Sequence, residues 1–139
     1  MFYRYEESLP IEMIPGLVRR MVADGGSMMI CEFILEKGVE IPAHAHPQEQ
    51  VGYVVSGKLR ITVNGESKDL GPGDCYYAPS GVQHGAVVLE RAVVADTFSP
   101  PREDYRLKEN QKPHPKGWGM LGAARTVLGI SEIVESSLP

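Results

Sequence analysis

The sequence has no long apolar run, no excess of positive charge and few cysteines, and each shortage argues against a class of protein. No stretch approaches the roughly 20 consecutive apolar residues that a membrane-spanning helix needs, so we expect no membrane partner. The 14 Lys and Arg are outnumbered by 18 Asp and Glu, and the formal net charge is -4. Arg19 and Arg20 are the only adjacent basic residues, so no basic patch predicts binding to nucleic acid.

The two cysteines, Cys31 and Cys75, lie far apart in apolar, strand-like stretches. Buried free thiols are therefore favoured over a disulfide, and free thiols fit the reducing cytoplasm. The first 13 residues show no basic segment followed by an apolar one, which is the pattern of a secretory signal peptide. We therefore expect a cytoplasmic protein.

Short stretches rich in β-branched and aromatic residues recur along most of the chain, and Gly, Pro, Asn or Asp separates most of them. They cover residues 17–23, 28–36, 51–57, 58–65, 74–79, 84–90 and 91–98. Asn64-Gly65 is typical of a two-residue hairpin turn. Because no helical pattern intervenes, the stretches predict an all-β sandwich or barrel over about 17–99, within one domain that covers 1–139.

The composition changes at Pro100. Residues 100–119 are polar and contain four prolines, so we expect a loop or an extended arm there. Residues 120–139 regain apolar side chains and predict either a short helix or an added strand, although Gly122 and Gly129 weaken both alternatives. We expect this C-terminal arm, about 100–139, to pack on its own barrel or on a neighbouring subunit.

Three of the four histidines lie at strand positions beside turns. His44 and His46 share one face of an extended segment, Gln50 begins the next strand, and His84 begins a later strand that can return to the same place. A single histidine is usually a surface or hydrogen-bonded core residue. Three imidazoles and an amide buried without a common partner, however, would each cost about 1–3 kcal/mol. A divalent metal ion held by His44, His46, Gln50 and His84 would satisfy all four groups.

These positions resemble the two sequence motifs of the cupin family. The first motif is matched by Gly38, His44, His46, Gln50 and Gly57. The second motif is matched by Gly73, Pro79, Gly81 and His84, and only 15 residues separate the two. The resemblance implies a single-domain cupin, which is a jelly-roll β-barrel with a metal site.

Two positions depart from the cupin pattern. Gln50 stands where a glutamate ligand is usual, and Val88 stands where an asparagine often ends the second motif. Three imidazoles and an amide leave the +2 charge of a metal ion uncompensated, which makes a stronger Lewis acid and a better host for an anionic substrate. Ni, Zn, Fe, Mn and Co all remain possible, because the ligand set does not choose among them.

A second group of residues lies at the end of the last predicted barrel strand. Asp96 and Phe98 share one face of that strand, and Arg102 follows shortly after it. Asp96 either faces the interior, where an ionised carboxylate is costly unless paired or reactive, or faces solvent. Arg102 either grips a substrate carboxylate or pairs with Glu103 or Asp104 at the surface. Periodicity alone leaves both questions open.

The segment is also similar to that of the pectin-degradation cupins that linearise unsaturated uronates. The resemblance implies an active site that contains Asp96, Phe98 and Arg102 beside a metal held by His44, His46, Gln50 and His84. It implies an enzyme whose partner is a small anionic, sugar-derived substrate, such as a 4,5-unsaturated uronate that is ketonised. Asp96 would move protons, Arg102 would hold the carboxylate and Phe98 would form an apolar wall. The alternatives are a cupin dioxygenase and a non-catalytic metal-binding or sugar-binding cupin.

One strand has an apolar outward face. If Gln50 faces inward, Val51, Tyr53 and Val55 face outward, which is unfavourable for a monomer. We therefore expect a homodimer. Tyr76 and Tyr77 are interpreted as ordinary strand aromatics, some of which cover a subunit interface.

Overall fold

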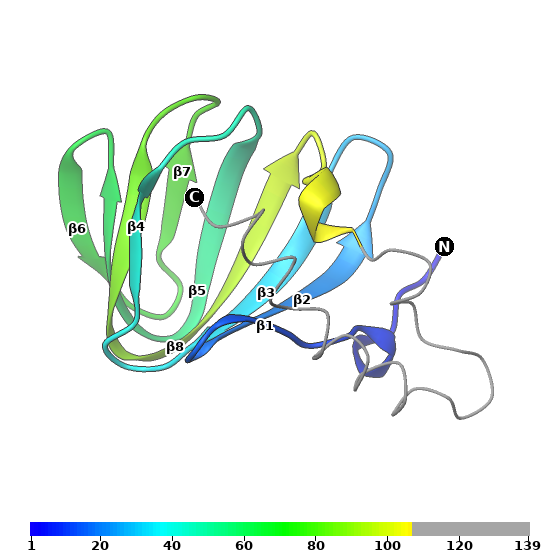
Figure 1. The fold of residues 1–139 in the computed structure, drawn as a ribbon, viewed down its shortest axis with the longest axis horizontal. Helices are drawn as coiled ribbons and strands as arrows, with labels where there is room; N and C mark the ends of the chain where they lie inside the picture. Colours follow the sequence, from blue (N-terminus) through cyan, green and yellow to red (C-terminus); the bar gives the residue numbers. More distant parts are fainter. Residues whose placement is uncertain (107–139) are drawn as a thin grey trace.

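The computed structural model describes residues 1–106, and almost all of their regular structure is antiparallel β-strand (Figure 1). The strands are β1 (Ile11–Ile14), β2 (Leu17–Asp24), β3 (Met29–Leu35), β4 (Glu40–His44), β5 (Glu49–Val63), β6 (Glu66–Leu70), β7 (Cys75–Ala78) and β8 (His84–Ser99). Two short 3-10 helices, η1 (Tyr5–Glu7) and η2 (Glu103–Tyr105), flank the strands. The expectation of an all-β fold is confirmed.

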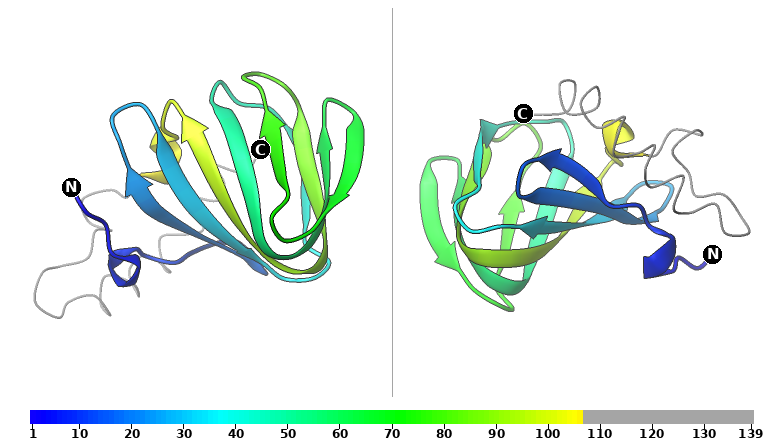
Figure 2. Two further views of the ribbon diagram at one scale, coloured as in Figure 1. Left: turned by 180° about the vertical axis from the view of Figure 1, so that it is seen from behind. Right: turned by 60° about the horizontal axis from the view of Figure 1, so that its bottom comes forward.

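The two longest strands, β5 and β8, run through both layers of the fold. Residues 49–56 of β5 pair with 93–99 of β8, and residues 58–63 pair with 84–90. Register shifts separate the two paired regions. At that point both strands bend, and the sheet folds back on itself (Figure 2). The two halves of each long strand therefore belong to layers that face each other.

Each layer is completed by shorter strands. β3 pairs with the second half of β8 and continues through β2 to β1, while β7 pairs with the first half of β5. β4 pairs with the first half of β8, and β6 pairs with the second half of β5. The two layers face each other and are joined where β5 and β8 bend (Figure 1).

The hydrophobic core lies between these layers. Alternation is clearest in β3, where Met29, Cys31, Phe33 and Leu35 are buried and their neighbours are only partly buried. Further core residues come from the other strands and from η2: Met13, Leu17, Val54, Leu59, Ile61, Val88, Ala92, Val94, Phe98 and Tyr105. Burying one large apolar side chain contributes about 1.5–3 kcal/mol, so this cluster is a major source of stabilisation for the barrel.

The strand prediction is correct in kind but too fragmented. Stretches 51–57 and 58–65 belong to one strand, β5, and stretches 84–90 and 91–98 both belong to β8. The structure also begins its sheet earlier than position 17, with β1 paired to β2. The hairpin turn is confirmed, because Asn64 and Gly65 both have positive φ, of 50° and 81°, between β5 and β6.

The expectation that both cysteines are buried is wrong for one of them. Both thiols are free, and Cys31 is buried whereas Cys75 is exposed. Cys75 opens β7, where the alternation places Ala78 in the interior and Cys75 and Tyr77 on the outside. Apolar neighbours on both sides in the sequence do not reveal which face of a strand a residue occupies.

Residues 107–139, which contain most of the expected C-terminal arm, lie outside the described residues. Residues 100–106 return to the barrel through η2, and the buried Tyr105 ring packs edge-on against Phe33 and Phe98. Within residues 1–106 no helix is long and apolar enough to cross a membrane.

Candidate active site

Three histidine side chains converge in the interior. His44 closes β4 and His84 opens β8, and the two residues are direct partners across these strands. His46 follows in the loop that leads into β5. One nitrogen of each ring lies within 4.8 Å of the corresponding nitrogens of the other two. The predicted histidine cluster therefore exists, although the strand that carries His44 ends before His46.

A backbone hydrogen bond fixes the orientation of each imidazole. The Nδ1 atoms lie 2.9–3.0 Å from the carbonyl oxygens of Pro42, Gln48 and Val82, each two residues away in the sequence. A carbonyl oxygen can only accept, so each Nδ1 carries the proton and each Nε2 presents a lone pair. The Nε2 atom of His84 is buried and has no hydrogen-bond partner within the described structure.

The local electrostatics keep these histidines neutral. Burial, helped by the neighbouring His84 and His46, lowers the pKa of His44 to about 4, although the hydrogen bond to the Pro42 carbonyl opposes the shift. Burial also lowers the pKa of His46 and His84, with the positive charge of Arg102 acting in the same direction. Neutral imidazole is the form that ligates metals, so the cluster is prepared to bind a cation without first losing protons.

Gln50 completes the group from the start of β5. Its Oε1 lies 3.1 Å from Nε2 of His46, which brings two lone pairs together once Nδ1 holds the ring proton. A cation shared by Oε1, this Nε2 and the orphaned Nε2 of His84 would satisfy all of these atoms. The four predicted ligands therefore fit a divalent metal ion by the chemistry of their donor atoms.

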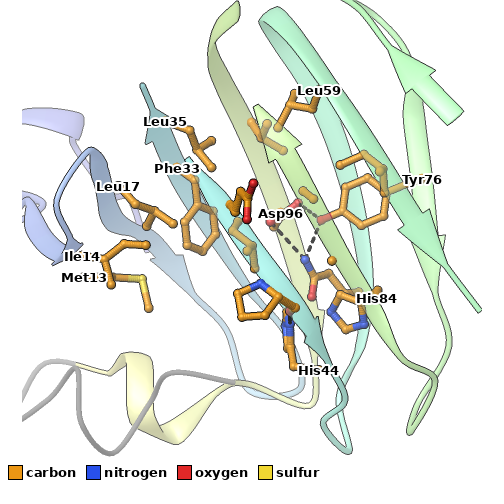
Figure 3. Close-up of a pocket in the computed structure, with 18 of the residues that line it drawn as sticks. Met13, Ile14, Leu17, Phe33, Leu35, His44, Leu59, Tyr76, His84 and Asp96 are labelled. Carbon is orange, nitrogen blue, oxygen red and sulfur yellow. Dashed lines mark hydrogen bonds between the residues drawn. The ribbon is translucent and has the colours of Figure 1, made fainter. Parts of the chain in front are cut away.

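The amide nitrogen of Gln50 joins the cluster to a buried acid. It donates to the Tyr76 hydroxyl at 2.6 Å and to Oδ2 of Asp96 at 3.1 Å. Tyr76 in turn donates to Oδ1 of Asp96 at 2.8 Å (Figure 3). Asp96 is only 6% exposed, so the solvent-facing alternative for this residue is excluded. Burial raises the pKa of the Asp96 carboxyl to about 7, although the hydrogen bonds from Tyr76 and Gln50 oppose the rise.

Arg102 lies at the same cavity but already has a partner. Its Nε and one terminal nitrogen donate to the two carboxylate oxygens of Asp104, at 2.9 and 2.6 Å. The guanidinium carbon lies 4.2 Å from the centre of the Tyr105 ring, and the residue is 9% exposed. The pairing with Asp104 that the sequence left open is therefore real. Arg102 is buried whereas Asp104 is exposed, and the pair leaves the other terminal nitrogen of Arg102 available.

One cavity connects these groups. Its polar wall carries His44, Gln50, Tyr76, His84, Asp96 and Arg102, and Phe98 lies among them with its ring 5.9 Å from that of His46. The rest of the lining is largely apolar and includes Met13, Ile14, Leu17, Phe33, Leu35, Leu59 and Ile61. Figure 3 shows Met13, Ile14, Leu17 and Phe33 grouped on one side of the cavity, away from His84 and Tyr76. The structure thus brings together all seven residues that the sequence singled out.

Sequence reasoning missed two contributors to this site, Tyr76 and Tyr105, and considered Asp104 only as a surface partner of Arg102. Tyr76 was expected to be an ordinary strand aromatic, but its hydroxyl bridges Gln50 and Asp96. Asp104 and Tyr105 hold Arg102 from the start of the predicted arm. The available signal was the strand period, which puts Tyr76 and Ala78 on one face and Tyr77 on the other. It does not say which face is inward.

Comparison with known proteins identifies the family of this chain. Residues 31–96 match the cupin domain family. The chain is 30% identical over 106 residues to the pectin degradation protein KdgF of Dickeya dadantii, which covers 74% of this chain and 96% of that protein. The structure of KdgF from Halomonas sp. superposes with a TM-score of 0.73 at 35% identity, and covers 76% of this chain and 98% of that one.

A second solved structure is equally similar. It is an RmlC-like cupin from Shewanella frigidimarina, at 37% identity and a TM-score of 0.72, with 76% of this chain and 95% of that chain covered. The similarity extends over nearly the whole of each relative and includes both β-layers. This chain therefore belongs to the cupin family, has the all-β cupin jelly-roll fold, and resembles the pectin-degradation cupins.

Proposed function

We propose that this protein is a metal-dependent cupin enzyme that converts small anionic, sugar-derived molecules, and specifically that it ketonises 4,5-unsaturated uronates. The observation that carries the proposal is a cluster of three histidines, two of which, His44 and His84, line the same cavity as the buried carboxyl group of Asp96 and the guanidinium of Arg102. The similarity to a pectin degradation protein over 96% of its length supports the substrate class.

The metal would be held by Nε2 of His44, His46 and His84 and by Oε1 of Gln50. All four ligands are neutral. When bound, a divalent ion would supply Lewis-acid polarisation of substrate oxygens, which is strongest where no carboxylate ligand reduces its charge. The donor set accepts Ni, Zn, Fe, Mn or Co, so the proposal does not depend on one of them.

Arg102 would bind the substrate carboxylate. Asp104 occupies the edge of the guanidinium formed by Nε and one terminal nitrogen. The other terminal nitrogen is not bonded to Asp104, so its N–H groups can donate to a substrate carboxylate. Stacking on Tyr105 at 4.2 Å restricts the side chain, so little conformational entropy is lost when an anion binds. Phe98, which is 1% exposed, would exclude water beside the reacting carbons.

Asp96 would move the proton. The conversion is an isomerisation in which the ring C–O bond opens, a hydroxyl loses its proton and a carbon gains one, so no oxidant is required. A single carboxyl group that first accepts and then donates a proton is sufficient for this exchange. Tyr76 and Gln50 hold the Asp96 oxygens at fixed positions at the cavity wall.

The test is the Asp96→Asn variant with a 4,5-unsaturated uronate. We expect the loss of the conjugated uronate absorbance to stop, because an amide cannot accept and return the proton. The Asn side-chain oxygen can still accept from Nε2 of Gln50, so with metal supplied in excess the metal content by elemental analysis should stay at the wild-type level. Asp69→Asn is a matched control, since Asp69 pairs with Arg60 at the surface of β5 and β6. Turnover by Asp96→Asn at the wild-type rate would exclude the proposed role.

The same assay without oxygen separates this proposal from a cupin dioxygenase. Ketonisation consumes no O₂ and should proceed at an unchanged rate, whereas dioxygenation would stop. A protein that binds metal but converts none of the unsaturated uronates offered would instead favour a non-catalytic binding cupin.

A further inference from the structure

The hydroxyl of Tyr76 lies at the centre of a compact buried network. β7 and β8 flank β5, and Tyr76 and Asp96 are both direct partners of Gly52 on β5. A Cβ on Gly52 would lie 2.0 Å from the Tyr76 ring and 2.4 Å from Oδ1 of Asp96. Glycine therefore clears the interior face of the central strand, and Tyr76 reaches across it to the acid.

The network determines which way the Gln50 amide points. Asp96 oxygens accept hydrogen bonds when ionised, and one of them already accepts from the Tyr76 hydroxyl at 2.8 Å. The other accepts from Nε2 of Gln50 at 3.1 Å, and the same Nε2 donates to the Tyr76 oxygen at 2.6 Å. With both amide protons committed on this side, Oε1 is directed to the opposite side, towards His46.

We propose that Tyr76 and Asp96 together orient the Gln50 amide for metal binding, and that they make an amide rather than a carboxylate the required ligand at position 50. Tyr76 is a positioning residue in this scheme, because it acts through Gln50. The inference rests on the metal site of the proposed function, but it does not depend on the substrate. This orientation explains why the chain has Gln50 where other cupins usually have a glutamate ligand.

A glutamate at position 50 would remove both amide protons. Its carboxyl group would then lie about 3 Å from that of Asp96 inside the barrel. The two acids would either repel each other or have to take up a proton, and both outcomes cost free energy relative to the amide–carboxylate pair. Tyr76 has one proton and could serve only one of the two acids. The choice of ligand and the presence of the buried Asp96 are therefore coupled.

The first experiment measures metal affinity directly. Metal-free wild type, Tyr76→Phe and Tyr77→Phe are titrated with Co²⁺ and followed by the visible absorption of the bound ion. Loss of an outer-shell hydrogen bond typically weakens metal binding 10–100-fold, so we expect about a tenfold or greater weakening for Tyr76→Phe. Tyr77→Phe, the outward-facing neighbour, should bind as wild type does. Equal affinity for Tyr76→Phe and wild type would overturn the inference.

The second experiment needs no metal. Thermal unfolding of the metal-free proteins should show a lower midpoint for Gln50→Glu than for wild type. It should show recovery in the double variant Gln50→Glu/Asp96→Asn, because the second substitution places an amide opposite the new carboxylate and so returns two donor protons to the pair. A double variant that is no more stable than Gln50→Glu would contradict the coupling.

These outcomes are distinct from failure of the proposed reaction. If the wild type binds Co²⁺ and the two sets of variants behave as described but no uronate is converted, the inference stands and the proposed substrate is wrong. If the wild type binds no Co²⁺, the metal site and the inference fall together.

Discussion

Individual polar side chains are buried mainly where the candidate site lies. Six polar or charged residues are buried within residues 1–106, and four of them belong to the site: Gln50, His84, Asp96 and Arg102. Burying such groups costs free energy unless each finds a partner, and a fold would otherwise fill these positions with apolar residues. Their concentration in one cavity is therefore better explained by function than by stability.

The two cysteines differ in environment, and the difference is measurable. Burial raises the pKa of the Cys31 thiol to about 12, so at pH 8 it is protonated as well as inaccessible. Cys75 is exposed on β7. We expect a thiol reagent such as dithiobis-nitrobenzoate to label one cysteine rapidly in the folded protein and both in guanidinium chloride. Mass spectrometry should place the rapid label on Cys75, and rapid labelling of Cys31 would contradict its burial.

One strand can supply several residues of the site, and the bend in that strand brings those residues together. β8 carries His84 at its start and Asp96 and Phe98 near its end, in halves that belong to opposing layers. Gly57 of β5 lies at the bend with φ +83°, and a Cβ there would lie 2.1 Å from the carbonyl oxygen of Arg91. The bend thus turns two distant parts of one strand towards the same cavity.

Gly52→Ala should test how closely β5, β7 and β8 approach each other at the site. The added methyl would overlap the Tyr76 ring, which is held in place by two hydrogen bonds. Overpacking of this kind typically costs about 1–3 kcal/mol. We expect a decrease of that size in the free energy of unfolding, measured by urea denaturation.

Gly26→Ala is the control for this substitution, because no atom lies within 4 Å of a Cβ at that position. It should unfold at nearly the wild-type urea concentration. Equal stability of Gly52→Ala and wild type would mean that Tyr76 moves freely, which would also weaken its assigned role in orienting Gln50.

At the scale of the whole molecule, one outer face is unusually apolar. Val51, Tyr53 and Val55 of β5 are 46%, 49% and 50% exposed, and Tyr77 of the adjoining β7 is 52% exposed. Val51 and Tyr77 are direct partners across the two strands, so these side chains form one continuous surface. A contiguous apolar surface of this kind is typical of a protein–protein contact.

We expect this face to form a homodimer, with light scattering giving twice the monomer mass of 15.3 kDa at micromolar concentration. Tyr53→Glu should shift the protein to the monomer, because a charge would be placed at the centre of the contact. Val87→Glu is the matched control, since Val87 is 37% exposed but lies on the half of β8 that pairs with β4. A wild type that stays monomeric would exclude the homodimer.

Local spacing along the chain was enough to predict the fold class and the candidate ligands. These predictions rest on the strand periodicity, on the Asn64-Gly65 turn and on the intervals between the candidate ligands His44, His46, Gln50 and His84. Each of these signals arises within a few residues or from a fixed separation along the chain. The cupin resemblance extended the candidate site to Asp96, Phe98 and Arg102, where periodicity alone left the question open.

The inward face of each strand, and the residues that meet across strands, became known only from the folded arrangement. Alternation requires Tyr76 and Tyr77 to point in opposite directions, but both faces of β7 are apolar or aromatic, so the pattern is equally compatible with either assignment. Because β7 and β8 both pair with β5, the face of β7 that carries Tyr76 points inward, and the Tyr76 hydroxyl lies between Gln50 and Asp96. The exposure of Cys75 and the burial of Arg102 have the same origin, because they depend on contacts between segments that local spacing does not encode.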